Sequence, residues 1–156
     1  MNLAPSTELN NEILILSSPE RILDAAYCVE QWPRLLGHYR WVKILSEGPA
    51  GRTVQMAARR GRIPLKWTAL QWRDEAAREV HFRHLRGPTR GMDVVWKLEP
   101  LAGPMGETRV TIRHDLRYPI PFLGPLIARY IVGGLFIHPV ATRTLRCFKQ
   151  ILEERG

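Results

Sequence analysis

The sequence contains few of the residues and motifs that would point directly to a reaction. Its two cysteines, Cys28 and Cys147, are far apart and outside any metal-ligand spacing. We therefore expect two free thiols in a reducing compartment, with a disulfide between them as the alternative. No glycine-rich phosphate loop, nucleophile elbow or paired-carboxylate pattern is present. The sequence thus predicts no metal site and no cofactor.

Long hydrophobic runs are also missing. The most apolar segment, Tyr118 to Val140, is interrupted by Pro119, Pro121, Pro125, Arg129, His138 and Pro139, which makes it a poor membrane span. Met1 to Thr7 is short and polar, without the pattern of a signal peptide. We expect a cytoplasmic protein. The apolar stretch Leu126 to Ile137 fits a buried helix, a homodimer contact or a segment lying on a membrane surface.

Acidic residues are fewer than basic ones. Lys and Arg number 23 against 15 Asp and Glu, a formal net charge of +8. One basic cluster is formed by Arg59, Arg60 and Arg62. This charge is compatible with three kinds of binding partner: an anionic membrane, an acidic protein or a nucleic acid. It also fits an ordinary basic surface without such a partner. Nucleic acid is the least favoured, because most of the five Trp fall on strand faces at core spacing.

The length of 156 residues fits one domain, spanning residues 1–156. A serine, a proline and a glutamate at Ser18-Pro19-Glu20 predict the start of a helix, and a second short helical segment follows at Val29 to Leu36. Apolar residues at every second position predict strands. Because the turns between these strands are short, we expect neighbouring strands to pair antiparallel. The predicted strands are Glu12–Leu16, His38–Glu47, Thr53–Arg59, Ile63–Trp72, Arg78–Leu85, Gly91–Glu99 and Thr108–Tyr118.

The C-terminal segment Leu126 to Arg155 has the spacing of a long amphipathic helix. Its apolar stripe has small residues at the centre, where Gly134 and Ala141 flank His138. Pro139 predicts a kink or a break at this point. The sequence therefore predicts an α+β fold, in which a curved antiparallel sheet of about six to seven strands wraps around the helix and leaves a cavity opposite its small residues.

The chain resembles the START-like, helix-grip superfamily, and within it the polyketide cyclase/dehydrase-like group. The resemblance spans nearly the whole chain and depends on the order and spacing of several segments. These are Trp32-Pro33-Arg34-Leu35-Leu36 followed by Tyr39, then Trp67, the strand from Gly91-Met92 to Trp96-Lys97-Leu98-Glu99-Pro100, the strand from Thr108 to His114-Asp115, and the C-terminal helix.

The resemblance implies a deep apolar cavity between sheet and helix, which relatives use for lipids, quinones, hormones or polyketide chains. In the aromatase/cyclase members a Tyr after the Trp-Pro segment lines the cavity, and Tyr39 matches it. Those enzymes also have an Arg four residues after the mid-strand Trp, where this chain has Gln71. Glutamine supplies no positive charge for an enolate, so this departure weakens the case for cyclisation.

Strand alternation independently places several polar side chains on apolar faces. We predict that Tyr39, His84 and His114 are catalytic, and that Gln71 and His138 are polar ligand contacts. Each histidine also fits a structural hydrogen bond at a strand end or helix turn. The remaining predicted ligand-binding residues are apolar or small: Met56, Trp67, Phe82, Met92, Trp96, Ile131 and Gly134.

Two functions remain open from the sequence. The first is an enzyme of the polyketide cyclase/dehydrase type that binds a hydrophobic molecule, such as a polyketide, lipid or quinone, in the cavity. The second is a non-catalytic carrier or chaperone of a lipid or quinone that docks on an anionic membrane. The residues do not identify the ligand or the oligomeric state.

Overall fold

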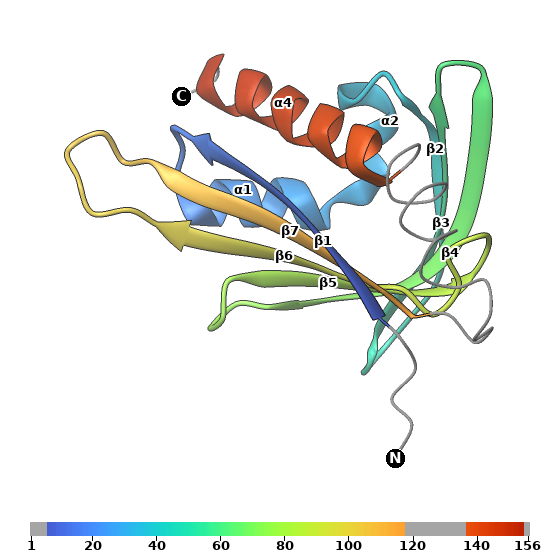
Figure 1. Ribbon diagram of the computed structural model, residues 1–156. Coiled ribbons are helices and arrows are strands. Elements are labelled where there is room, and N and C mark those ends of the chain that lie inside the picture. Colours follow the sequence, from blue (N-terminus) through green and yellow to red (C-terminus); the bar gives the residue numbers. More distant parts are fainter. Residues whose placement is uncertain (1–5, 118–136, 155–156) are drawn as a thin grey trace.

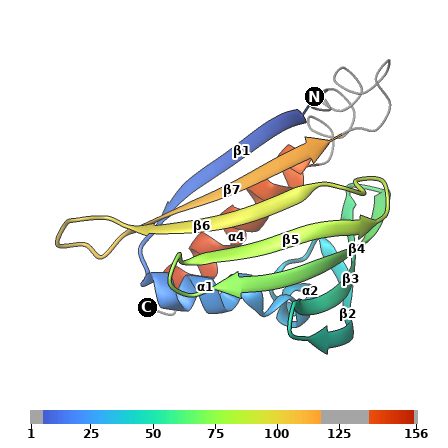
Figure 2. The same ribbon diagram turned by 90° about the horizontal axis from the view of Figure 1, so that it is seen from below.

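Seven strands form a single antiparallel sheet in the computed structural model, which describes residues 6–117 and 137–154. The order across the sheet is β1-β7-β6-β5-β4-β3-β2, so strands β2 to β7 pair with their neighbours in sequence and β1 pairs with β7. The sheet is strongly curved (Figures 1 and 2). The strands are β1 (Ser6–Ile15), β2 (Tyr39–Gly48), β3 (Gly51–Arg60), β4 (Ile63–Asp74), β5 (Glu79–Arg86), β6 (Asp93–Pro100) and β7 (Thr108–Arg117).

Three short helical segments follow β1: α1 (Pro19–Tyr27), the 3-10 helix η1 (Val29–Gln31) and α2 (Trp32–Leu35). The Ser18 side chain caps α1 by accepting a hydrogen bond from the backbone N–H of Arg21, at 3.3 Å. Pro19 occupies the first position, where a missing N–H does no harm. Both helical segments expected after the first strand are therefore confirmed.

The last helix, α4 (His138–Glu154), lies across the concave face of the sheet (Figure 1). Pro139 is the second residue of α4 as described, and the kink or break expected at this point involves residues outside the described part of the chain. The sequence also predicted helix from Leu126 to residue 136, but this segment lies outside the described residues. The buried stripe has the spacing of an amphipathic helix and consists of Ala141, Thr144, Leu145, Phe148 and Leu152. The predicted α+β architecture, a curved sheet wrapped around the C-terminal helix, is confirmed.

A buried arginine fastens the short helices to the sheet. Arg52 on β3 lies directly opposite Gln71 on β4, and its Nε donates to Gln71 Oε1 at 2.7 Å. Its Nη2 donates to the carbonyl oxygen of Tyr27 and pairs with Glu30 Oε2 at 3.0 Å. Gln71 Nε2 donates to the same Tyr27 carbonyl at 2.9 Å. The C-terminus of α1 is thus held by two side chains from the neighbouring strands β3 and β4.

We predict that Arg52→Met lowers the free energy of unfolding by about 3 kcal/mol, because it leaves buried acceptors without a donor. The matched control is Arg73→Met. Arg73 also lies over the Tyr27 ring but pairs with Asp24 and Glu75 at the surface, where such pairs contribute at most about 1 kcal/mol. Urea unfolding measures both. Equal losses in the two variants would contradict the role given to Arg52.

Candidate functional site

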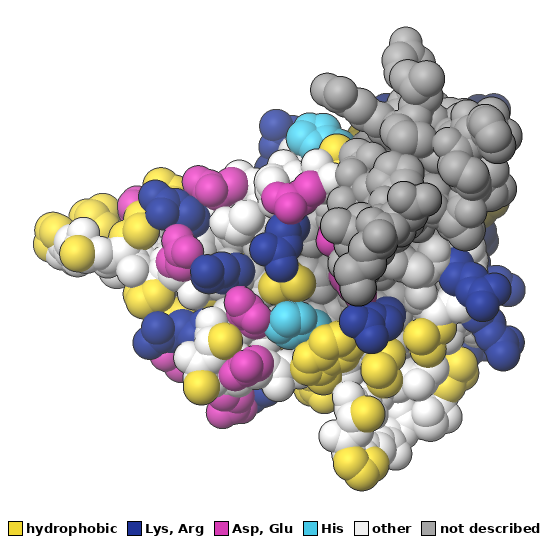
Figure 3. Space-filling model, turned by 60° about the horizontal axis from the view of Figure 1, so that its bottom comes forward, with side chains coloured by type: hydrophobic (Ala, Val, Ile, Leu, Met, Phe, Trp, Pro, Cys, Tyr) yellow, Lys and Arg dark blue, Asp and Glu magenta, His cyan; other side chains and the backbone are white. Residues whose placement is uncertain are grey.

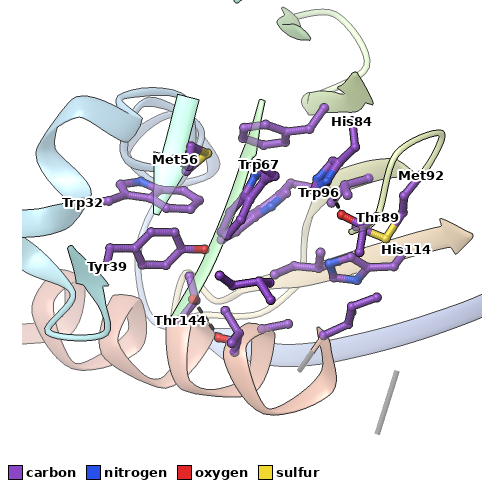
Figure 4. A pocket seen from close by; sticks show the side chains of 17 residues that line it. Trp32, Tyr39, Met56, Trp67, His84, Thr89, Met92, Trp96, His114 and Thr144 are labelled. Atoms are coloured by element: carbon purple, nitrogen blue, oxygen red, sulfur yellow. Dashed lines mark hydrogen bonds between the residues drawn. The ribbon is translucent and has the colours of Figure 1, made fainter. Parts of the chain in front are cut away.

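A cavity of about 90 Å³ lies between the concave face of the sheet and the N-terminal half of α4 (Figure 4). Its walls come from α2, from six strands and loops of the sheet, and from the first turns of α4. Most of the lining is apolar, as is usual for small-molecule sites. The described lining residues are Trp32, Tyr39, Met56, Leu65, Trp67, Phe82, His84, Thr89, Met92, Val94, Trp96, Ile112, His114, Ile137, Val140, Ala141 and Thr144.

The cavity is smaller than a typical ligand site. Pockets for drug-sized ligands measure about 300–1,000 Å³, and an engineered cavity of about 150 Å³ binds benzene. At about 90 Å³ the space accommodates several waters or a small fragment. A larger ligand therefore requires lining side chains to move apart. The cavity lies between sheet and helix as the sequence predicted, but the described space of about 90 Å³ is small for the deep cavity implied by the family resemblance.

Aromatic rings build one wall of the cavity. Trp32 meets Tyr39 edge-on with ring centroids 5.0 Å apart, and Tyr39 meets Trp67 edge-on at 6.1 Å. Trp67 stacks in parallel on the His84 imidazole at 5.8 Å. Rings packed in these geometries support one another. The rings hold the Tyr39 hydroxyl and the His84 imidazole in fixed directions (Figure 4).

Two imidazoles and a threonine form the polar end of the cavity. His84 Nδ1 and Thr89 Oγ1 share a hydrogen bond of 2.7 Å. The His114 side chain comes from β7 and is buried, and its Nδ1 has no hydrogen-bond partner among the described residues. A buried polar atom without a partner costs about 1–3 kcal/mol. Because His114 lines the cavity, a ligand or a water that reached this nitrogen would remove that cost.

The ionisable groups of the cavity are neutral at pH 7. Burial lowers the pKa of His84 to about 4, and nearby Asp93 opposes this only in part. Burial, with a smaller contribution from neighbouring His84, lowers the pKa of His114 to about 3. Burial raises the pKa of the Tyr39 hydroxyl well above its usual value, and a hydrogen bond with Thr144 opposes part of that change. Since no described lining residue is Asp, Glu, Lys or Arg, the cavity offers hydrogen bonds rather than charge.

The structure brings together eight of the twelve residues predicted to form the site. They line the cavity from β2, β3, β4, β5, β6, β7 and the loop before β6, and their contact with a ligand remains a prediction. These eight are Tyr39, Met56, Trp67, Phe82, His84, Met92, Trp96 and His114. Two further predicted residues, Ile131 and Gly134, lie outside the described part of the chain.

Gln71 and His138 are not among the described residues that line the cavity, and their contact with a ligand stays a prediction. Gln71 is buried on the expected face of β4, but Arg52 and the Tyr27 carbonyl occupy its amide. The His138 side chain is exposed, and its Nδ1 meets Asn11 Nδ2 of β1 at 3.0 Å. The described part of the helix starts with residues 137 and 138, and the His138 imidazole contacts Asn11 of the edge strand β1.

Sequence reasoning missed two polar residues of the cavity. Thr89 lies in the loop between β5 and β6, where no periodicity reveals which side chains are buried. Thr144 follows Ala141 by three positions on α4, and this spacing could have identified it. Its Oγ1 donates to the Val140 carbonyl at 2.8 Å and meets His38 Nε2, also at 2.8 Å. His38 is buried beside the cavity without lining it.

Other expectations can be compared with the described residues. Cys28 and Cys147 are both free thiols. No three His, Cys, Asp or Glu side chains within residues 6–117 and 137–154 are arranged to hold a metal ion. Among the helices of these same residues, none has both the length and the apolar character needed to cross a membrane.

A curved seven-stranded sheet wrapped around a C-terminal helix, with an apolar cavity between them, defines the helix-grip class of START-like proteins. The family model described as polyketide cyclase/dehydrase and lipid transport matches residues 17–138. The chain therefore belongs to that family. No significant match was found among curated protein sequences.

Solved structures share the fold at low sequence identity. The Zhui aromatase/cyclase from Streptomyces sp. R1128 is 18% identical, with a TM-score of 0.81 over 97% of this chain and 96% of that chain. A protein from Thermus thermophilus is 19% identical, with a TM-score of 0.77 over 96% and 99%. A START superfamily protein from Mycobacterium smegmatis is 13% identical, with a TM-score of 0.74 over 96% and 99%. Identities this low show a common fold.

The buried histidines should make the stability of the protein depend on pH. A histidine in the unfolded chain has a pKa near 6.5 and is protonated below that pH. In the folded protein, His84 and His114 stay neutral down to about pH 4. The free energy of unfolding should therefore fall as pH drops from 7 to 5, and His114→Leu should reduce this fall by about 2 kcal/mol. Urea unfolding of both proteins at pH 7 and pH 5 measures this change in the free energy of unfolding. A fall of the same size in the variant would contradict a neutral, buried His114.

Filling the space beside α4 should remove ligand binding without unfolding the protein. We predict that Ala141→Leu weakens binding of 1-naphthol by about tenfold or more, since the added side chain occupies the cavity. Quenching of the cavity tryptophans reports binding. The free energy of unfolding should change by about 1 kcal/mol or less, because the new methyl groups enter empty space. Undiminished binding would show that naphthol binds elsewhere.

Proposed function

We propose that the protein binds a hydrophobic small molecule with carbonyl or hydroxyl groups, of the polyketide, lipid or quinone class, in the cavity beside α4. The observation that carries this proposal is His114 Nδ1, a buried polar atom without a partner among the described residues, in an apolar cavity. A ligand hydroxyl that donates to this nitrogen, or a carbonyl that accepts from it in the other tautomer, would remove the cost of leaving it unpaired.

We further propose that the site catalyses a cyclisation or dehydration of the bound molecule. In a dehydration, the carbon next to a carbonyl loses a proton to an imidazole of His84 or His114. The C=C bond forms as the C–O bond of a β-hydroxyl breaks, and the leaving oxygen takes up a proton to become water. The Tyr39 hydroxyl would donate a hydrogen bond to the carbonyl oxygen as negative charge develops there. The reaction is redox-neutral and needs no cofactor.

The family and the fold support this reading. The chain belongs to a family described by polyketide cyclases and dehydrases, and it shares its fold with the Zhui aromatase/cyclase. The missing positive charge at Gln71 is not replaced from Arg52, because the Arg52 guanidinium is already bonded to Gln71, Tyr27 and Glu30. Stabilisation of an enolate would therefore depend on neutral hydrogen-bond donors, of which Tyr39 is the best placed.

A non-catalytic carrier is the second candidate. The low pKa values of His84 and His114 favour it, because an imidazole whose pKa is near 4 or 3 is a weak base at pH 7. In this reading the same groups only bond the polar end of a lipid or quinone. The two candidates share the binding function and differ in whether a bound β-hydroxyketone reacts.

A small β-hydroxyketone separates these two candidates. We predict that the protein accelerates dehydration of 4-hydroxy-4-phenylbutan-2-one to the conjugated enone, followed by ultraviolet absorbance. Tyr39→Phe and His114→Gln should each lower the rate by about a hundredfold, the usual contribution of one proton-transfer group, while still binding the compound. Tyr27→Phe and His81→Gln are the matched controls, since neither residue lines the cavity.

The outcomes distinguish the site assignment from the function. Unchanged rates in both Tyr39→Phe and His114→Gln would refute the catalytic roles of these residues. Binding without acceleration by the unaltered protein would support the carrier. Failure to bind this compound, 1-naphthol and long-chain quinones alike would refute the hydrophobic-ligand proposal itself.

A further inference from the structure

Two neighbouring turns of the sheet are strongly basic. The turn between β3 and β4 exposes Arg59, Arg60 and Arg62, and Lys66 is exposed just beyond it. The loop between β5 and β6 exposes Arg86 and Arg90. Neither segment, 48–73 or 80–92, contains an Asp or a Glu. The basic residues of these turns therefore have no acidic neighbour within their own segments.

The two turns meet beside the cavity. Gly87 has a φ of 110° and packs so closely on β4 that an added Cβ would lie 2.8 Å from the carbonyl oxygen of Lys66. Only glycine allows this contact, so the β5–β6 loop is held against β4. Leu65, near the start of β4, and Thr89, in the β5–β6 loop, both line the cavity. The basic turns thus surround one end of the proposed ligand site.

Exposed apolar side chains lie among these cations. Ile63 at the start of β4 is 53% exposed, and Leu85 near the end of β5 is 40% exposed. Figure 3 shows that Asp and Glu on the visible face gather on the half that carries the β6–β7 turn. The opposite half displays Lys and Arg among its described residues. Lys and Arg also appear beside the acidic residues of the first half (Figure 3), so what distinguishes the two basic turns is that their segments contain no Asp or Glu, with Ile63 and Leu85 exposed beside the cations.

We propose that this basic surface, defined by Arg59, Arg62, Ile63, Leu85 and Arg86, docks on an anionic phospholipid bilayer. The arginines bind phosphate and carboxylate headgroups, and Ile63 and Leu85 enter the boundary between headgroups and acyl chains. An acidic protein or RNA would satisfy the cations but not the exposed apolar residues beside an apolar cavity. The proposal builds on the hydrophobic-ligand function, since docking would bring the cavity close to the acyl chains from which a lipid or quinone is taken.

Vesicle sedimentation tests this surface. The protein should sediment with phosphatidylcholine vesicles containing phosphatidylserine, bind pure phosphatidylcholine weakly, and lose binding at raised salt. The triple variant Arg59→Gln, Arg62→Gln, Ile63→Ser should bind the anionic vesicles more weakly, by about tenfold or more. The matched control is the triple variant Arg21→Gln, Arg113→Gln, Met105→Ser. It removes two positive charges and one exposed apolar residue outside the two basic turns, and it should bind the vesicles as the unaltered protein does.

Three results would overturn the proposal: no binding to anionic vesicles, equal losses in the two triple variants, or salt-dependent binding of an RNA probe without vesicle binding. Binding of 1-naphthol is measured on the same preparations and should be retained by both triple variants. Absent vesicle binding with retained naphthol binding would refute the docking surface alone. If the unaltered protein binds neither 1-naphthol nor the β-hydroxyketone nor long-chain quinones, the ligand function is refuted instead.

Discussion

The structure depends on how unevenly α4 fills the concave face of the sheet. At its middle, Phe148 packs edge-on against Trp32 and Trp96, with ring centroids 5.6 and 5.5 Å apart. One and two turns closer to its N-terminus, the same stripe presents Thr144 and Ala141, which are too short to reach the sheet wall. Burial of the large rings stabilises the helix on the sheet, and the short residues leave the cavity. One amphipathic stripe thus both closes the core and creates the candidate site.

The polar groups of the cavity follow from that burial. Because the histidines are removed from water, their pKa values fall and they remain uncharged at neutral pH. A neutral imidazole donates through one nitrogen and accepts through the other, so it can bind either a hydroxyl or a carbonyl. The His114 nitrogen, which has no partner among the described residues, destabilises the free protein, and the hydrogen-bonded group around Arg52 on β3 stabilises the scaffold that holds it.

The sequence predicted most of the fold, because its signals are local. Period-two alternation identified every strand to within a few residues at most ends, although β1 begins at Ser6 rather than Glu12. The small residues of the helix stripe indicated the cavity. Two of the predicted ligand contacts lie outside the described cavity lining, and the reason is tertiary. Gln71 is inward-facing as predicted, but a cross-strand arginine occupies it, and no local pattern shows that pairing. His138 has the expected stripe spacing, but its imidazole meets Asn11 from a strand 127 positions earlier in the chain.

The most direct test of this account is a crystal structure of the protein soaked in 1-naphthol. The account predicts electron density for the naphthalene rings between Ala141 and the aromatic wall, with the naphthol oxygen within hydrogen-bonding distance of His114 Nδ1. A cavity closed by side chains, or a His114 imidazole already bonded to another part of the protein, would contradict the account.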